Sequence, residues 1–166
     1  MNDPAGLDDR RTSPPNLAHT GGVSSFLTST ALSLSVVCMA FAAQLDPAPS
    51  GWGTHTQLGL VPCSFMAWVG LPCGFCGVTT TFAIMSDLRP VDALINQPFG
   101  FLLWWTVAFG GIIAALEMAD PRDRWRRIIQ KIWPWRSPII STYFLVFSAS
   151  WAFRIAYFVI FLSSES

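Results

Sequence analysis

Three long apolar stretches constrain the fold of this 166-residue chain more than any other feature. They run over about residues 25–45, 98–118 and 139–162. A helix needs about 20 predominantly apolar residues to cross a bilayer, and a helix satisfies its own backbone hydrogen bonds in lipid. The sequence therefore predicts an all-α integral membrane protein with three transmembrane helices.

The composition agrees with lipid as the solvent for much of the chain. Apolar residues make up 52% of the sequence and charged residues only 12%, whereas a soluble domain usually has about 25% charged residues. The length suits one membrane domain, residues 23–166, after a polar N-terminal tail, residues 1–22. The tail is rich in Asp, Pro, Asn and Gly, so it is expected to be disordered unless another subunit holds it.

The basic residues predict the orientation in the membrane. The loop over residues 119–137 contains six of the ten Lys and Arg residues, whereas the loop over residues 46–97 contains only Arg89. Positively charged loops stay in the cytoplasm. We therefore expect a bacterial inner-membrane protein with a cytoplasmic N-terminus, and with the 46–97 loop and the C-terminus outside the cytoplasm.

The first apolar stretch has a feature of a cleaved signal peptide. Ala40, Phe41 and Ala42 resemble a signal-peptidase site. However, the apolar run exceeds a typical signal core, and the pair Arg10 and Arg11 stands far from it. We expect this stretch to be retained as a transmembrane helix.

The inner loop has the pattern of an amphipathic helix lying on the membrane surface. Its apolar residues recur at helical spacing and its basic residues occupy the other faces. Such a helix fixes the topology and anchors the loop, or it binds anionic lipid or an acidic partner. The residues expected at the membrane surface are Trp125, Trp133, Arg124, Arg127 and Lys131.

The outer loop also contains helical segments. Residues 79–85 favour a short helix, residues 86–90 break it, and Pro90 suits the first turn of a second helix. Asp92 fits the electropositive first turn of that helix. We expect short interfacial or partly re-entrant helices over residues 64–95, lying on the outer leaflet.

Three of the four cysteines, Cys63, Cys73 and Cys76, lie in this outer loop. The Cys-x-x-Cys pair followed by Gly77 suits a metal knuckle, with Cys63 as a third ligand and His55 as a fourth. The same residues suit a structural disulfide or a redox-active dithiol in an oxidising compartment. Zinc or another thiolate-bound metal is therefore a candidate cofactor, beside the two disulfide alternatives.

The sequence around these cysteines resembles an uncharacterised family of small bacterial membrane proteins. The matching residues are Cys63-Ser64-Phe65 and the run Gly70-Leu71-Pro72-Cys73-Gly74-Phe75-Cys76-Gly77-Val78-Thr79. The family signature is Cys-Pro-Phe, then Gly-Leu-Pro-Cys-Pro-x-Cys-Gly-x-Thr-Arg, then a short helix and Asn-Pro before a transmembrane helix. The resemblance covers about residues 60–118, and it implies this architecture and a role for the cysteines. This chain has Ser64 and Gly74 in place of prolines, Thr80 in place of the arginine, and Asn96-Gln97-Pro98 in place of Asn-Pro.

Small residues mark two helix faces. In transmembrane helices, small residues four apart let two backbones approach closely. We expect the second and third transmembrane helices to pack through these faces, or a foreign helix to bind one of them. The residues are Gly110, Gly111, Ala114 and Ala115 in the second helix, and Ser148, Ala152 and Ala156 in the third.

Arg154 is a charge inside the third apolar stretch, in a stripe of aromatic residues. An ionisable residue within a transmembrane segment is a functional candidate by default. We expect its side chain to snorkel to a lipid headgroup or to contact a partner subunit, because the sequence offers it no evident internal partner. Glu117 is expected at the opposite end of the membrane.

These features predict a non-catalytic accessory or scaffolding subunit of a larger bacterial membrane complex. The alternative is a metal-binding or redox-active membrane protein that uses the outer cysteines. No catalytic constellation is visible, and both His19 and His55 lie outside the apolar stretches where a buried haem would need a ligand. The expected partners are the lipid bilayer and other membrane subunits, and no nucleic acid.

Overall fold

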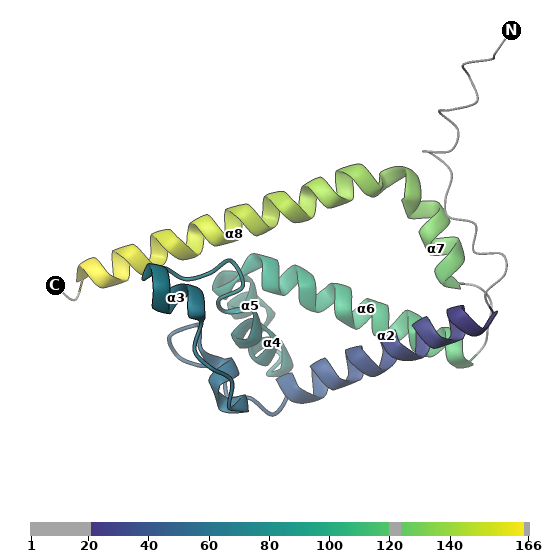
Figure 1. Ribbon diagram of the computed structural model, residues 1–166, viewed down its shortest axis with the longest axis horizontal. Coiled ribbons are helices and arrows are strands. Elements are labelled where there is room, and N and C mark those ends of the chain that lie inside the picture. Colours follow the sequence, from purple (N-terminus) through teal and green to yellow (C-terminus); the bar gives the residue numbers. More distant parts are fainter. Residues whose placement is uncertain (1–20, 120–123, 165–166) are drawn as a thin grey trace, which may run out of the picture.

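The computed structural model describes residues 21–119 and 124–164 of the chain. The tail predicted over residues 1–22 lies almost entirely outside the described residues. Within the described ranges all regular structure is helical, and the three long helices are α2 (Gly21–Ala42), α6 (Pro98–Ala119) and α8 (Arg136–Ser164) (Figure 1). Each contains a stretch long and apolar enough to cross a membrane, so the predicted all-α fold with three candidate spans is confirmed.

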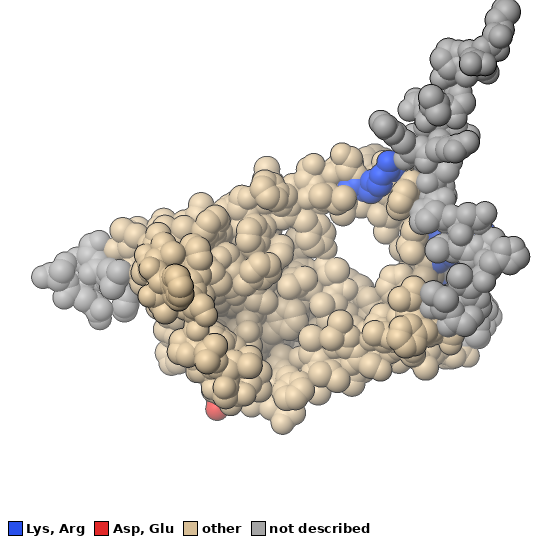
Figure 2. Space-filling model, viewed as in Figure 1, with Lys and Arg blue, Asp and Glu red and all other residues tan. Residues whose placement is uncertain are grey.

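The long helices turn large apolar side chains outward. Phe26 and Leu34 of α2, and Ile160 of α8, are each more than 60% exposed. Figure 2 shows that the described surface on this face is almost entirely uncharged, with Lys and Arg gathered at the α7 end. Such surfaces are stable when lipid rather than water surrounds the helices.

The helix ends differ from the predicted ones by a few residues. α2 ends at Ala42 instead of residue 45, because the next residues form tighter turns, with Gln44 N donating to the carbonyl of Phe41 at 3.1 Å. Pro47 follows and cannot continue a helix. α8 begins at Arg136 instead of residue 139, because Pro138 is tolerated in a first helical turn.

Residues 43–97 form a compact unit at one end of the long helices, which we call the end cap. It contains the 3₁₀ helix η2 (Thr54–Leu58) and the helices α3 (Ser64–Val69), α4 (Val78–Ser86) and α5 (Pro90–Asn96). The predicted break between two short helices and the restart at Pro90 are therefore confirmed, although α4 extends through Ser86. The η2 turn was not predicted from the sequence.

α4 does not lie on a surface, as we expected of residues 64–95, but forms the centre of the end cap. All its residues from Thr80 to Met85 are buried. Ile84 and Met85 join Ala93 of α5 in a small apolar core, which Phe101 and Trp104 of α6 cover. Within the outer loop, burial is thus concentrated in α4, whereas the irregular residues 59–62 are exposed.

The predicted amphipathic helix is α7 (Arg124–Ile132), which continues through η3 (Trp133–Trp135) into α8. Arg127 and Lys131 are exposed, whereas Arg124, Trp125 and Trp133 are half-buried. α7 and the end cap lie at opposite ends of the long helices (Figure 1). Arg124 pairs with Glu117 at the end of α6, so that carboxylate is remote from the end cap.

The predicted packing of α6 on α8 through small residues is wrong. Gly111 faces α2 instead: a Cβ there would lie 2.8 Å from the Cβ of Ser35, whose hydroxyl donates to the carbonyl of Val107 at 3.2 Å. Ala114 is fully buried, whereas a Cβ on Gly110 would meet no atom within 4 Å and Ala115 is exposed. In α8, Ser148 is half-buried and Ala152 and Ala156 are exposed.

α6 and α8 meet through larger side chains near the end cap. The rings of Phe99 and Phe147 pack edge to face at 5.1 Å, and the Thr106 and Tyr143 hydroxyls hydrogen-bond to each other. Towards α7 the two helices diverge, which leaves the opening seen in Figure 2. Bulky aromatic residues at the contact keep the axes of α6 and α8 apart, so the small residues of α8 are not used there.

Candidate thiolate metal centre

Two turns of the end cap bring the three cysteines together. Cys63 precedes the first turn of α3, and its carbonyl accepts a hydrogen bond from Ala67 N at 3.1 Å. Gly70 ends α3 in the left-handed region, at φ 73°, and so reverses the chain. Cys73 and Cys76 then form a tight turn, with Cys76 N donating to the Cys73 carbonyl at 3.0 Å.

Gly77 allows this turn to enter α4. Its φ is 97°, a left-handed conformation that glycine adopts without steric strain. The carbonyl of Gly77 accepts the first hydrogen bond of α4, from Thr81 N at 2.8 Å. The tight turn predicted after the second cysteine is thus confirmed.

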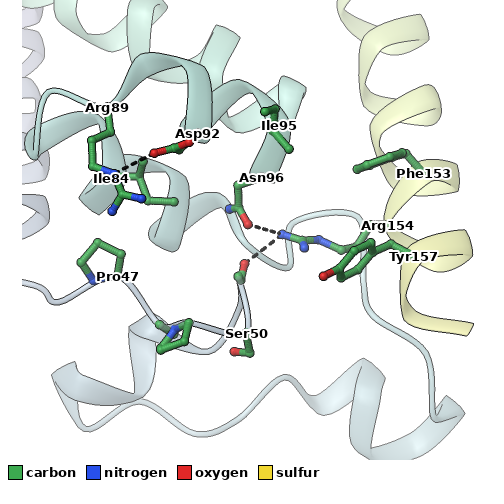
Figure 3. A pocket seen from close by; sticks show the side chains of 13 residues that line it. Pro47, Ser50, Ile84, Arg89, Asp92, Ile95, Asn96, Phe153, Arg154 and Tyr157 are labelled. Atoms are coloured by element: carbon green, nitrogen blue, oxygen red, sulfur yellow. Dashed lines mark hydrogen bonds and ion pairs between the residues drawn. The ribbon is translucent and has the colours of Figure 1, made fainter. Parts of the chain in front are cut away.

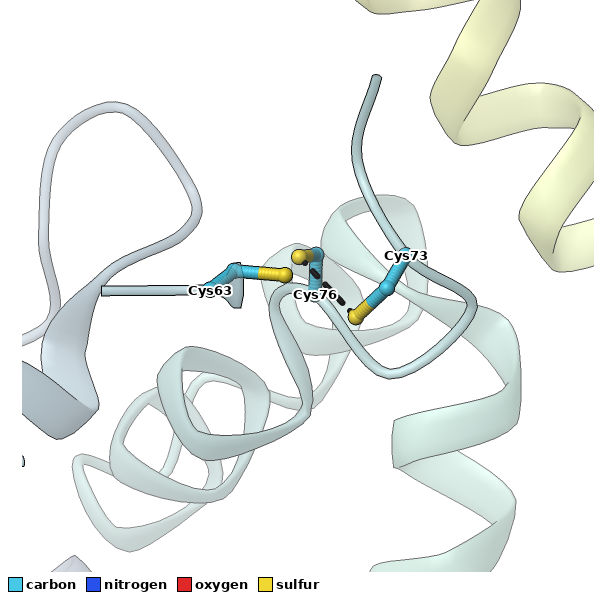
Figure 4. A group of neighbouring side chains, drawn as sticks. All are labelled: Cys63, Cys73 and Cys76. Carbon is cyan, nitrogen blue, oxygen red and sulfur yellow. Dashed lines mark hydrogen bonds between the residues drawn. The ribbon is translucent and has the colours of Figure 1, made fainter. Parts of the chain in front are cut away.

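The three sulfur atoms converge on one point (Figure 4). The Sγ atoms of Cys63, Cys73 and Cys76 all lie within 4.8 Å of one another, and those of Cys73 and Cys76 are 3.2 Å apart. All are free thiols; Cys76 is buried, while Cys63 and Cys73 are half-buried. The predicted fourth ligand, His55 of η2, is not part of this group, and Cys38 lies apart from it in α2.

The thiols have different acidities. Burial raises the pKa of Cys63, but hydrogen bonds from the Met66 backbone and from the thiols of Cys76 and Cys73 outweigh this effect and lower that pKa to about 7. For Cys76, burial raises the pKa well above its usual range, and the hydrogen bonds to Cys73 and Cys63 raise it further. Of these two thiols, Cys63 is therefore the more readily deprotonated, and it is only half-buried.

Two residues of an aromatic stripe on α8, Phe147 and Trp151, cover the cysteine turns. The Trp151 indole donates to the carbonyl of Pro72 at 2.9 Å, and its ring packs against that of Phe65. Phe147 packs so closely on Gly74 that a Cβ there would lie 2.4 Å from the ring. Any larger residue at position 74 would require the Phe147 ring to shift.

Arg154 continues this stripe, and the expectation that it has no internal partner is wrong. It is only 4% exposed, and its Nη2 donates to the carbonyl of Gly51 at 2.9 Å and to Asn96 Oδ1 at 3.2 Å (Figure 3). Its guanidinium also lies 5.6 Å from the ring centre of Trp52. The side chain therefore turns into the end cap rather than out to lipid.

A cavity of about 330 Å³ lies beside Arg154. The cavity lies between α8, the loop before η2 and α5. Its polar lining includes Ser50, Asn96 and Tyr157, and the Arg89–Asp92 ion pair, 2.7 Å long, also borders it.

Several residues that support the site were not predicted. Asn96 donates to Thr81 Oγ1 at 2.9 Å as well as accepting from Arg154, and the buried Gln97 donates from Nε2 to the carbonyl of Gly74 at 2.9 Å. The one sequence signal for Asn96 and Gln97 was that this chain has Asn96-Gln97-Pro98 where the resembled family has Asn-Pro. Thr54 and Thr80 share a buried hydrogen bond of 2.8 Å between their hydroxyls.

No protein family, no curated protein and no solved structure matched this chain. The resemblance noted from the cysteine motif thus stays a prediction.

Proposed function

We propose that this chain is a membrane protein that binds one thiophilic metal ion through Cys63, Cys73 and Cys76. The convergence of three sulfur atoms within 4.8 Å carries the proposal. Thiolates are soft ligands that favour ions such as Zn²⁺ and Cu⁺. The converged thiols lower the entropic cost of assembling a site, because folding has already closed the loops between them.

The sulfur spacing suits coordination after a small adjustment. A Zn–S bond is about 2.3 Å long, so two thiolates on a tetrahedral ion stand about 3.8 Å apart. The distance between the Cys73 and Cys76 sulfurs, 3.2 Å, would have to increase slightly. Any pair of sulfurs near the upper limit of 4.8 Å would have to move closer together. Rotations of the side chains supply changes of this size.

The site offers three protein ligands among the residues described, and two of them are half-buried. Structural zinc sites usually have four protein ligands, whereas sites with an open position accept a further ligand. We therefore favour a site that captures or passes on its ion over a permanently closed structural site. The distribution of Lys and Arg supports placing it on the extracytoplasmic side of a bacterial inner membrane.

Metal titration of the purified, reduced protein in mild detergent tests this function. We expect one Co²⁺ per chain, with the intense near-ultraviolet absorption of cobalt–thiolate bonds. Cys63→Ser, Cys73→Ser and Cys76→Ser should each weaken binding, whereas the matched control Cys38→Ser should not. Binding that persists in all three variants, or no binding at all, would overturn the proposal.

A thiol–disulfide role is the competing outcome of the same experiment. The 3.2 Å between the Cys73 and Cys76 sulfurs also suits formation of a disulfide. Thiol counting on protein purified without reductant distinguishes the two. A Cys73–Cys76 disulfide together with failure of the reduced protein to bind Co²⁺ would favour the redox role.

An accessory role in a larger complex is a second candidate. The exposed small residues Ala152 and Ala156 of α8 favour it, because such faces allow close approach of another helix. Arg154 no longer favours this role, because its hydrogen-bond partners lie within the same chain. Sizing in mild detergent tests it: a particle that contains only this chain as a monomer would count against an accessory role.

A further inference from the structure

The positive charge of Arg154 is buried without a carboxylate beside it. Among the residues described, no Asp or Glu oxygen lies within 4.0 Å of its nitrogens. Asp92, which borders the same cavity, pairs with Arg89 instead. A guanidinium stays protonated in proteins, so this charge persists.

Neutral acceptors satisfy the guanidinium only in part. Gly51 and Asn96 both accept from the same nitrogen, Nη2, while the buried Nε has no partner among the described residues. A buried charge is strongly destabilising unless it is paired or fully hydrogen-bonded. The surroundings of Arg154 therefore favour a negative charge nearby.

The cysteine turn is the neighbouring element that can supply this charge. The guanidinium packs against Gly77, the residue directly after Cys76, so closely that a Cβ there would lie 2.1 Å from Nη2. The positive charge next to the cysteine turn therefore comes from Arg154 of α8, through its contact with Gly77.

We propose that Arg154 is a positioning residue for the thiolate site, whose charge favours metal complexes with net negative charge; this rests on the proposed function. Three cysteines that bind a divalent ion as thiolates form a complex with charge −1. Arsenite, As(OH)₃, instead condenses with three thiols to release three waters, and its complex is neutral. Arg154 should therefore discriminate between these two complexes of the same three sulfurs.

The discrimination follows from the low dielectric of the site. Coulomb attraction between Arg154 and an anionic complex grows as water is excluded. Outer groups that support metal ligands typically contribute 10- to 100-fold to affinity. A purely structural role for Arg154 would instead affect both complexes alike, because both need the same three sulfur positions.

The test compares Cd²⁺ and arsenite binding by the full chain in detergent. We expect Arg154→Gln to weaken Cd²⁺ binding about tenfold or more, while arsenite binding changes less than about threefold. Arg154→Lys, which keeps the charge, should retain most of the Cd²⁺ affinity. Equal loss of both ligands, or loss of neither, would overturn the inference.

A second variant covers the case in which Arg154→Gln fails to fold. Tyr157 is half exposed and borders the cavity beside Arg154 (Figure 3). Tyr157→Glu places a carboxylate there and should weaken Cd²⁺ binding without affecting arsenite binding. Its neutral control, Tyr157→Gln, should leave the binding of both ligands unchanged. Identical behaviour of these two variants would contradict a charge effect, whereas failure of the wild type to bind Cd²⁺ would reject the metal site itself.

Discussion

Gly77 leaves the space that the Arg154 guanidinium occupies. A Cβ on Gly77 would lie 2.1 Å from Arg154 Nη2 and 2.9 Å from the carbonyl oxygen of Gly51. The same glycine ends the cysteine turn and begins α4, so one position joins the thiol group, the helix and the buried charge. The contact links residues far apart in the sequence and holds α8 against the end cap.

Gly77→Ala should therefore destabilise the protein more than glycine strain alone explains. Gly53 is the matched control, because its φ of 87° is also left-handed but nothing lies within 4 Å of its Cβ position. We expect Gly53→Ala to lower the free energy of unfolding by about 1–2 kcal/mol. Gly77→Ala should lower it by a further ~1–3 kcal/mol, through overpacking against Arg154.

Denaturant unfolding in one detergent, followed by circular dichroism, measures this difference. Equal losses in the two variants would show that Arg154 yields to the added methyl group without cost. The variants should also differ in Cd²⁺ affinity, since only position 77 adjoins the thiols and Arg154.

The adjacent glycines of α6 provide a second matched pair. Gly111 faces Ser35 of α2 with 2.8 Å between the two Cβ positions, whereas Gly110 meets no atom within 4 Å. Gly110→Ala should leave the melting temperature unchanged or raise it, because alanine favours a helix by up to about 1 kcal/mol over glycine. Gly111→Ala should lower the melting temperature by forcing α2 and α6 apart. The reverse order would contradict the assignment of this face to α2.

How far the sequence predicts this molecule depends on the range of the interaction. The apolar stretches and Pro90 act locally, so the three long helices and the start of α5 followed from them. The choice of partner for Gly111 did not, because small residues allow close packing without specifying which helix approaches.

The candidate site shows the same division. The spacing of Cys73 and Cys76 fixes their turn, whereas the approach of Cys63 depends on α3 and its end at Gly70. Arg154 was identified as a functional candidate, but its contacts with Gly51 and Asn96 span 103 and 58 residues of sequence. The periodicity of α8 cannot reveal such partners.

The buried hydroxyl pair of the end cap gives a third prediction. Thr54 and Thr80 are each 1% exposed and share a hydrogen bond of 2.8 Å, and Thr54 Oγ1 also accepts from Ala48 N at 3.0 Å. Thr80→Val should cost about 1 kcal/mol of stability, and Thr54→Val more, because it also leaves the Ala48 amide unpaired. The double variant should cost less than the two single losses together, as expected for residues in contact. Strict additivity in a double-mutant cycle would argue against the bond.

The acidity of Cys63 gives the last prediction. Its pKa is lowered from 9.0 to about 7, whereas that of Cys76 is raised, so near pH 7 about half of the Cys63 side chains are thiolates and Cys76 is a thiol. Because the thiolate is the nucleophile, iodoacetamide should modify Cys63 before Cys76 in the metal-free protein. The rate should rise from pH 6 to about 8 and then level off, because deprotonation is nearly complete about one unit above the pKa. The lowered pKa also means that Cys63 contributes stability that is fully present above pH 9 and is lost as the pH falls through 7.

Mass spectrometry of the alkylated peptides measures the order of modification, and Cd²⁺ should protect Cys63 if the three thiols share the ion. Faster modification of Cys76, or a Cys63 rate that still rises steeply above pH 9, would contradict this assignment.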